Sequence, residues 1–432
     1  MTEPVEKSKT LHKAIASKNW STVRRLAESL NIKYEFGGIS LNQGIPRDLV
    51  TDIVRKISTS AIDAQDDYGS TALYRSAFDG HTDVCKILIE SGANKDIQNV
   101  DGATALYVSA QNGHTDACGL LIQSGANKDI QRKDGYTALH VGASNGHTDI
   151  CRLLIQSGAN KNIQTVDGAT ALYVSAQNGH TYACGLLIQS GANKDIQRKD
   201  GATALYVSVQ NGHTDACGLL IQSGANKDIQ TKVGYTALHV GAFTGHTDIC
   251  RLLIQSGANK DIQAEDGVTA LYLSALKCHK DACELLIQSG ANKDIQADNG
   301  VTALYASAQD GHTDICRLLI QSGANKDIQV EDWATALHIS AFNGHTDICR
   351  LLIQSGANKD IQKKDGVTAL YASAQEGHTD ICRLLIQSGA NKDIQVENGA
   401  TALYASAFKG HTDICRLLIQ SGANKDIQNE DP

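Results

Sequence analysis

Apolar residues recur along most of this chain in a pattern with a period of 33 residues. Every step is 33, with no insertion or deletion, so eleven copies fill residues 68–430. A fixed period of this length is the signature of a stacked repeat array. The leucine of a Thr-Ala-Leu triplet marks the copies at Leu73, Leu106, Leu139, Leu172, Leu205, Leu238, Leu271, Leu304, Leu337, Leu370 and Leu403.

The copy at 101–133 predicts two short helices followed by a turn. Thr104 is a suitable N-cap for a helix over 105–112, and Gly113 can take the left-handed conformation that ends it. Thr115 begins a second helix, which Gly125 ends. Each helix is too short to be stable alone, and each has an apolar face that only a neighbouring repeat can cover. Stacking of repeats is therefore what should create the fold.

The ends of the chain depart from the pattern. Residues 1–10 predict a disordered start, and residues 11–67 a degenerate N-terminal cap repeat with a linker helix after Pro46. Residues 68–430 form one array of eleven repeats, and 431–432 are a C-terminal stub. Between repeats, the Asp134-Gly135 pair predicts a tight turn or a β-hairpin tip.

The residues of one copy resemble the ankyrin repeat. The resemblance rests on Thr-Ala-Leu-His-Val-Gly-Ala at 137–143, Gly146-His147, and Leu153-Leu154-Ile155 ahead of Gly158-Ala159. It implies an all-α solenoid of stacked helix–turn–helix units with β-hairpin or turn tips, curved, with a concave face that meets partners.

The chain departs from this family at two positions. The proline of the family's T-P-L-H motif is alanine in every copy, and its histidine is tyrosine except at His140, His239 and His338. Alanine favours helix, so the first change costs little. The tyrosines are expected to alter how the first helix is hydrogen-bonded to the turn.

Composition excludes several classes of protein. The net charge of −8 argues against a nucleic-acid binder, which carries a basic face. No apolar run approaches the length of a membrane span, and the polar first residues argue against a secretory signal. Eleven of the twelve cysteines share one repeat phase, from Cys85 to Cys415, too far apart to form disulfides between neighbouring copies. Buried, reduced thiols suit the cytoplasm, with the nucleus as the other candidate.

Repeated His and Cys residues raise the question of chemistry. His114 and Cys118 lie four apart, as metal ligands on a helix can, but a closed site needs four ligands and the next pair lies a repeat away. The expected roles are a turn histidine that holds backbone groups and a core cysteine. Cys278 beside His279 is the one local enrichment. Eleven copies of a Cys-His pair do not resemble one active site. We expect no metal, no cofactor and no catalysis.

Differences between copies indicate where a partner could bind. They concentrate at the tips and late in the first helix, where aromatic and charged residues gather. We expect the stretch from Tyr235 to Phe342 to be central, although free drift at exposed positions explains the same variation equally well. The candidate partner-binding residues are Tyr136, Tyr235, Phe243, Leu276, Trp333, Phe342, Phe408, Arg132, Lys133, Arg198 and Lys199.

These observations predict a non-enzymatic scaffold that binds a protein or peptide on its concave surface of tips and first helices. Nucleic acid and membrane are not expected partners. Two alternatives stay open: a substrate-recruiting or accessory subunit of an enzyme complex, and a spacer array or fragment of a larger protein. The last repeat keeps the internal apolar pattern at Leu417 and Leu418, so self-association through it is also expected.

Overall fold

The computed structural model describes residues 62–427, which fall into two compact units divided after Ala225. Each unit is a stack of helix pairs. The first unit contains α4 (Ala72–Phe78), α5 (Thr82–Glu90), α6 (Ala105–Gln111), α7 (Thr115–Gln123), α8 (Ala138–Ser144), α9 (Thr148–Gln156), α10 (Ala171–Gln177), α11 (Thr181–Gln189), α12 (Ala204–Gln210) and α13 (Thr214–Gln222).

The second unit continues the same alternation of a short first helix and a longer second helix. Its helices are α14 (Ala237–Thr244), α15 (Thr247–Gln255), α16 (Ala270–Leu276), α17 (Lys280–Gln288), α18 (Ala303–Gln309), α19 (Thr313–Gln321), α20 (Ala336–Phe342), α21 (Thr346–Gln354), α22 (Ala369–Glu376), α23 (Thr379–Gln387), α24 (Ala402–Phe408) and α25 (Thr412–Gln420).

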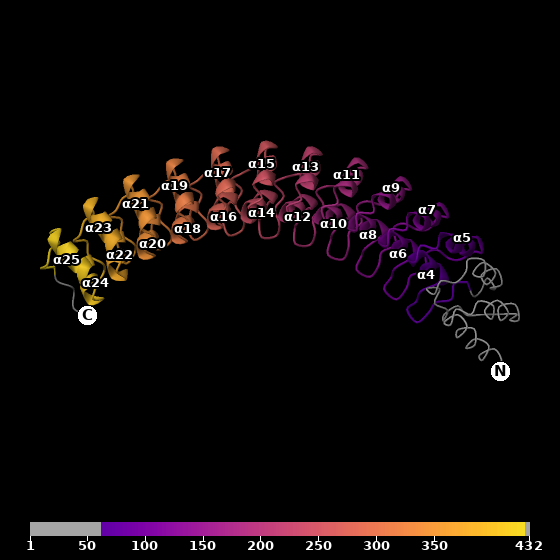
Figure 1. Cartoon of the computed structure of the whole chain (residues 1–432), viewed down its shortest axis with the longest axis horizontal. Coiled ribbons are helices and arrows are strands. Elements are labelled where there is room, and N and C mark those ends of the chain that lie inside the picture. Colours follow the sequence, from indigo (N-terminus) through magenta and orange to yellow (C-terminus); the bar gives the residue numbers. More distant parts are fainter. Residues whose placement is uncertain (1–61, 428–432) are drawn as a thin grey trace, which may run out of the picture. The chain divides into compact units, whose positions relative to one another are not determined.

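Within each unit the first helices form one layer and the second helices form another (Figure 1). Inside a unit, each first helix packs against the first helix of the next repeat, and each second helix packs against the next second helix. The tips project beyond the layer of first helices (Figure 1). The predicted all-α stack of helix pairs is therefore confirmed. None of the helices in residues 62–427 is both long enough and apolar enough to cross a membrane. The predicted disordered start and most of the N-terminal cap lie outside the described residues, as do residues 428–432.

The helix boundaries follow from the residues that cap them. The Thr104 side chain accepts a hydrogen bond from the backbone N–H of Tyr107 at 3.2 Å, so the predicted N-cap of α6 is confirmed. The helix ends at Gln111, and Gly113 follows in the left-handed region with φ 78°. Asp116 lies in the first turn of α7, where the helix dipole favours a negative charge.

Each repeat buries a small set of residues that its neighbours cover. Leu106, Ala110, Cys118 and Leu121 are at most 1% exposed. The cysteine also lies against a serine, with 3.0 Å between the Ser109 hydroxyl and the Cys118 sulfur. Burial raises the pKa of the Cys118 thiol to about 12, so the thiol stays protonated and unreactive. All twelve cysteines are free in the structure, and only Cys278 is exposed.

Within each unit, side-chain amides join one repeat to the next. The Gln98 amide donates to the carbonyl oxygen of Gly102 in its own tip at 2.7 Å and to that of Gln131 in the following repeat at 3.0 Å. In the second unit, the Gln263 amide bridges in the same way to its own tip and to Gln296. One glutamine therefore fixes both a tip and its distance to the next tip.

The tips are turns rather than paired strands. The Arg132 N–H donates to the Tyr136 carbonyl oxygen at 2.8 Å, and the Lys133 N–H donates to the Asp101 carbonyl oxygen of the preceding tip at 3.0 Å. These bonds join single residues and do not extend into a ladder. The described part of the chain accordingly contains no strand, so of the two tip forms expected, a turn or a β-hairpin, the turn is found.

In most of the described repeats, the histidine of the inter-helix turn holds the backbone of the preceding repeat, as expected. His114 Nε2 lies 2.9 Å from the carbonyl oxygen of Phe78 at the end of α4, in the preceding repeat, a contact in which the ring N–H donates. The ring also leaves no room beside it, because a Cβ on Gly80 would lie 2.5 Å from His114 Nδ1. Gly80 is therefore required both for its φ of 73° and for this contact.

The three first-helix histidines differ from the tyrosines that replace them elsewhere. His140 Nδ1 accepts from the Thr137 N–H at 3.2 Å and completes a capping box, while Nε2 lies 3.3 Å from the Ala169 carbonyl oxygen of the next repeat. Tyrosine instead reaches the tip, as where the Tyr74 hydroxyl accepts from the Asn99 amide. The expectation that this substitution alters the link between first helix and turn is confirmed.

Acid should weaken the repeats that contain these histidines. Burial lowers the pKa of His140 and of His338 to about 4, below the unfolded value, and lowers the pKa of His239. Below about pH 6.5 the unfolded chain thus binds more protons than the folded chain, and the free energy of unfolding falls as pH falls. Each histidine lowers it by up to about 1.4 kcal/mol for each pH unit. Replacing all three by tyrosine is expected to reduce the drop in urea midpoint between pH 7 and about pH 5. An unchanged drop would contradict this role.

Two copies carry a side chain where the others have glycine in the left-handed region. Cys278 has φ 58° in the inter-helix turn, and Trp333 has φ 66° at a tip. The strain costs about 1 kcal/mol for each residue. Both side chains are exposed, so little packing offsets it.

Replacing Cys278 or Trp333 by glycine is expected to raise the free energy of local unfolding by about 1 kcal/mol, measured by hydrogen exchange in the surrounding helices. Gly311→Ala is the matched control, because its Cβ would lie 2.8 Å from the His345 ring and should destabilise the array. Slower hydrogen exchange after Gly311→Ala, or faster hydrogen exchange after Cys278→Gly, would disprove this account.

Candidate functional site

The surface that varies most between copies is made by the tips and the C-terminal ends of the first helices, and we call it the tip face. The glutamine amides hold the tips, and the threonine N-caps set where the first helices begin. Invariant residues thus position the variable ones.

Three predicted aromatic residues of the second unit are exposed on its tip face. Phe243 at the end of α14 is 42% exposed, Trp333 is 51% exposed, and Phe342 at the end of α20 is 48% exposed. The ammonium group of Lys277 lies 4.9 Å from the centre of the Phe243 ring. Apolar side chains of this size are therefore presented to solvent at the places that the sequence indicated.

The predicted tyrosines are less available. Tyr136 and Tyr235 are half-buried, each with its ring against the histidine that follows four residues later. The Tyr235 and His239 rings stack with centroids 5.5 Å apart and an interplanar angle of 6°. Each of these tyrosines is therefore only partly exposed on the tip face, and its ring packs against a histidine that caps the first helix.

Two predicted residues of the second unit lie at other helix ends. Leu276 ends α16 and is half-buried. Phe408 ends α24 in the last described repeat, where it is 76% exposed and its ring stacks on Tyr404 at 6.2 Å. Phe243 and Leu276 occupy the same position in successive repeats, whereas Trp333 lies at a tip and Phe342 at a helix end of one repeat.

The basic residues of the first unit fall into two kinds. Arg132 is held inside its own stack, with its guanidinium 5.8 Å from the centre of the Tyr107 ring and Nη1 donating to the tyrosine hydroxyl at 3.2 Å. Arg198 lies over Tyr173 in the same way, at 5.7 Å. Lys133 and Lys199, one residue further on, are exposed. The arginines brace a tip and the lysines are presented to solvent.

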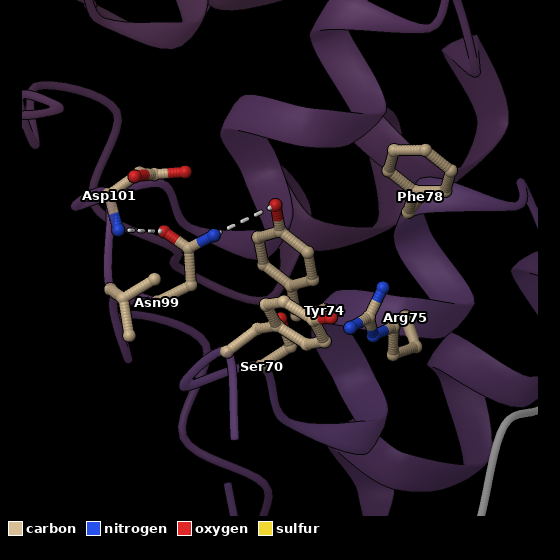
Figure 2. A pocket seen from close by; sticks show the side chains of 8 residues that line it. Ser70, Tyr74, Arg75, Phe78, Asn99 and Asp101 are labelled. Atoms are coloured by element: carbon tan, nitrogen blue, oxygen red, sulfur yellow. Dashed lines mark hydrogen bonds between the residues drawn. The ribbon is translucent and has the colours of Figure 1, made fainter. Parts of the chain in front are cut away.

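The first unit also contains a pocket of about 380 Å³ that the sequence did not indicate (Figure 2). Its lining residues are Tyr68, Ser70, Tyr74, Arg75, Phe78, Asn99, Val100 and Asp101. The Arg75 guanidinium lies over the Tyr68 ring at 5.7 Å and forms an ion pair of 2.8 Å with Asp66. Figure 2 shows the Asn99 amide reaching the Tyr74 hydroxyl and, with its oxygen, the backbone N–H of Asp101.

One signal in the sequence could have revealed this pocket. The position of Arg75 holds valine, leucine, isoleucine or alanine in every other copy, so a charged residue there is unique. Although burial alone would raise the pKa of Asp66, hydrogen bonds from Arg75, Ser70 and Tyr68 hold it below its usual value. The carboxylate of Asp66 and the guanidinium of Arg75 thus neutralise each other within the fold.

Metal binding finds no support among the described residues. Within 62–427, no three His, Cys, Asp or Glu side chains lie together as a metal ion requires. The inter-helix histidines are engaged with backbone carbonyl groups, and the buried thiols have raised pKa values. Cys278, His279 and Cys283 therefore do not form the local metal cluster that their spacing raised as a question.

Arg75→Val, which restores the aliphatic residue of the other copies, tests the ion pair. Asp66 keeps its hydrogen bonds from Tyr68 and Ser70, so the loss should be below about 1 kcal/mol. Hydrogen exchange in α4 is expected to speed up slightly at low salt and to match the wild type at high salt. Val108→Ala, at the same position in the next repeat, is the control with no salt dependence. A salt-independent effect of Arg75→Val would show that packing, not charge, explains the role of Arg75.

Comparison with known proteins agrees with this geometry. A family model described as "Ankyrin repeats (3 copies)" matches the chain in overlapping segments. The matched residues are 39–132, 84–165, 106–198, 155–231, 176–264, 211–297, 252–332, 271–363 and 337–429. A search of the curated proteins found no match.

Proposed function

Because this chain belongs to the ankyrin-repeat family, whose members generally mediate protein–protein interactions, we propose that it is a non-enzymatic scaffold. Its partner is a protein or a peptide, bound on the tip face of the second unit between Tyr235 and Phe342. The alternating helices and invariant ladders hold this surface in place. No chemistry in this chain is required for the function.

The observation that carries the proposal is the exposure of large aromatic side chains at the variable positions. Phe243, Trp333 and Phe342 are each about half exposed. Aromatic side chains that are presented to solvent on a preorganised surface are effective anchors, because they bury much area at a small entropic cost. Trp333 adds a further argument, since it keeps a strained backbone conformation that glycine would relieve.

The two alternative functions differ from the scaffold in what the chain would bind. A recruiting subunit of an enzyme complex would use the same surface, with the enzyme as an additional partner. A spacer would bind nothing specific. Cytoplasmic or nuclear location remains our expectation, on the grounds that the buried thiols are reduced. Self-association through the last repeat also stays a prediction.

The experiment replaces the anchors by residues that other copies already carry. In the full chain, Trp333→Gly with Phe342→Gln removes both aromatic side chains without a new strain, because glycine and glutamine occupy these positions elsewhere in the array. Affinity capture followed by quantitative mass spectrometry is expected to show at least about tenfold less of the specific partners. Helical content should not change.

The matched control is Phe78→Gln, which alters the same helix position in the first unit, outside the proposed surface. It should leave capture unchanged. Equal capture by the wild type and the Trp333/Phe342 variant would remove the proposed location, and no specific capture by the wild type would favour the spacer.

A further inference from the structure

We propose that the tip face of the second unit binds an extended segment of its partner that carries a lysine or arginine at every third position. The segment lies across the tips at 264–266, 297–299 and 330–333. This inference rests on the proposed function and adds the chemistry of the partner.

An apolar floor connects these tips to the first helices. Ala264, Val268, Leu273 and Ala297 form one buried cluster, each at most 8% exposed. The rings of Tyr235 and Tyr272 pack against the cluster and are partly exposed. A partner that covers the two rings gains apolar burial without the need for any residue of the floor to move.

The rim of this floor is acidic. The exposed carboxylates of the three tips are those of Glu265, Asp266, Asp298, Glu331 and Asp332. The three tips contain no basic residue. Within residues 62–427, only Asp332 of these five forms an ion pair, with Lys363 at 3.0 Å. The rim therefore presents uncompensated negative charge beside apolar surface, which favours a basic partner.

The first unit provides the contrast. The position of Glu265 and Glu331 carries Lys133 and Lys199 there, both exposed. The tips that carry Lys133 and Lys199 have the same local framework as the three acidic tips and the opposite charge at this position, and Lys232 and Lys364 occupy it at two further tips. An acidic segment would therefore prefer the lysine tips, and a basic one the tips at 264–266, 297–299 and 330–333.

The spacing of the tips selects the form of the segment. Packed helices lie roughly 8–10 Å apart, so successive tips are separated by about that distance. A polyproline-type chain turns once in three residues and rises about 9 Å per turn, which brings every third side chain to the same side. A basic residue at every third position then meets one carboxylate per tip, and the intervening apolar residues face the floor.

Aromatic faces at both ends of the floor suit a cationic segment. The Phe243 ring already accepts the ammonium group of Lys277. Trp333, 51% exposed at the last of the three tips, has no lysine or arginine over its ring among the described residues. Indole is the best side chain for holding a cation by its face. An arginine of the segment would occupy it.

The test measures binding of fluorescein-labelled peptides to the full chain by anisotropy. The first peptide repeats Lys-Pro-Leu, the second repeats Glu-Pro-Leu, and a third has the composition of the first with its lysines grouped together. We expect the first to bind at least about tenfold more tightly than the other two, with an affinity that falls as salt rises. Equal or tighter binding of the glutamate peptide would overturn the charge assignment, and equal binding of the grouped peptide would overturn the spacing.

Charge reversal at the rim locates the site. Glu265→Lys, Asp298→Lys and Glu331→Lys together introduce the residue found at this position in four other copies, so folding should be preserved. The triple variant is expected to bind the Lys-Pro-Leu peptide at least about tenfold more weakly. Lys133→Val with Lys199→Val in the first unit, which introduces the residue of two other copies, is the control and should not weaken it. Insensitivity to the triple reversal disproves the site.

The two proposals fail in distinguishable ways. If the loss of Trp333 and Phe342 reduces capture but the three reversals do not, the scaffold stands and the basic partner falls. If the reversals abolish binding of the Lys-Pro-Leu peptide while capture ignores the two aromatic residues, the basic site stands and the proposed location of the natural partner falls.

Discussion

Every other feature of this molecule depends on the packing of one repeat against the next. The first helices of seven or eight residues and the second helices of nine are too short to be stable in isolation. Their stability comes from apolar faces that neighbouring repeats cover and from amides such as that of Gln98, which bond to two tips at once. Contacts of this kind tolerate little variation. The residues that make them are therefore constant, and variation is left to the tip face.

The same constraint decides what the repeated histidines and cysteines do. Residues that are reactive in an enzyme are here enclosed by stacking, so Cys118 is a small apolar residue with a raised thiol pKa. His114 ties a turn to the preceding helix, and His140 caps its own helix and reaches the following repeat. Repetition of these residues follows the repetition of the joint between neighbouring repeats.

Sequence reasoning was most accurate where local chemistry decides the structure. Thr104 and Gly113 mark the ends of α6 because a side-chain cap and a left-handed turn depend only on neighbouring residues. It could not foresee contacts between a first helix and a tip 25 residues later, such as Arg132 over Tyr107. The sequence therefore places Arg132 and Lys133 together as candidate binding residues. In the structure, Arg132 holds its tip against Tyr107, and only Lys133 is exposed.

The pocket around Arg75 was missed for a related reason. Arg75 is the only charged residue at a position that is aliphatic in every other copy. A single departure of this kind is also what random drift would produce. Only the three-dimensional arrangement brings Asp66, Tyr68 and Arg75 together. The exposure of Phe243, Trp333 and Phe342 follows from the fold, whereas the charge of the tips follows from a few variable side chains.

The contact between Gly80 and His114 has a consequence for how the gene can change. A glycine in one repeat fits a histidine in the next, and the same pair recurs at later junctions, as between Gly113 and His147. Unequal exchange that adds or removes one 33-residue copy thus recreates a working junction at the new boundary. Copy number is consequently free to change in single steps. Each gain would add one more rung to the array and one more tip on which selection can act.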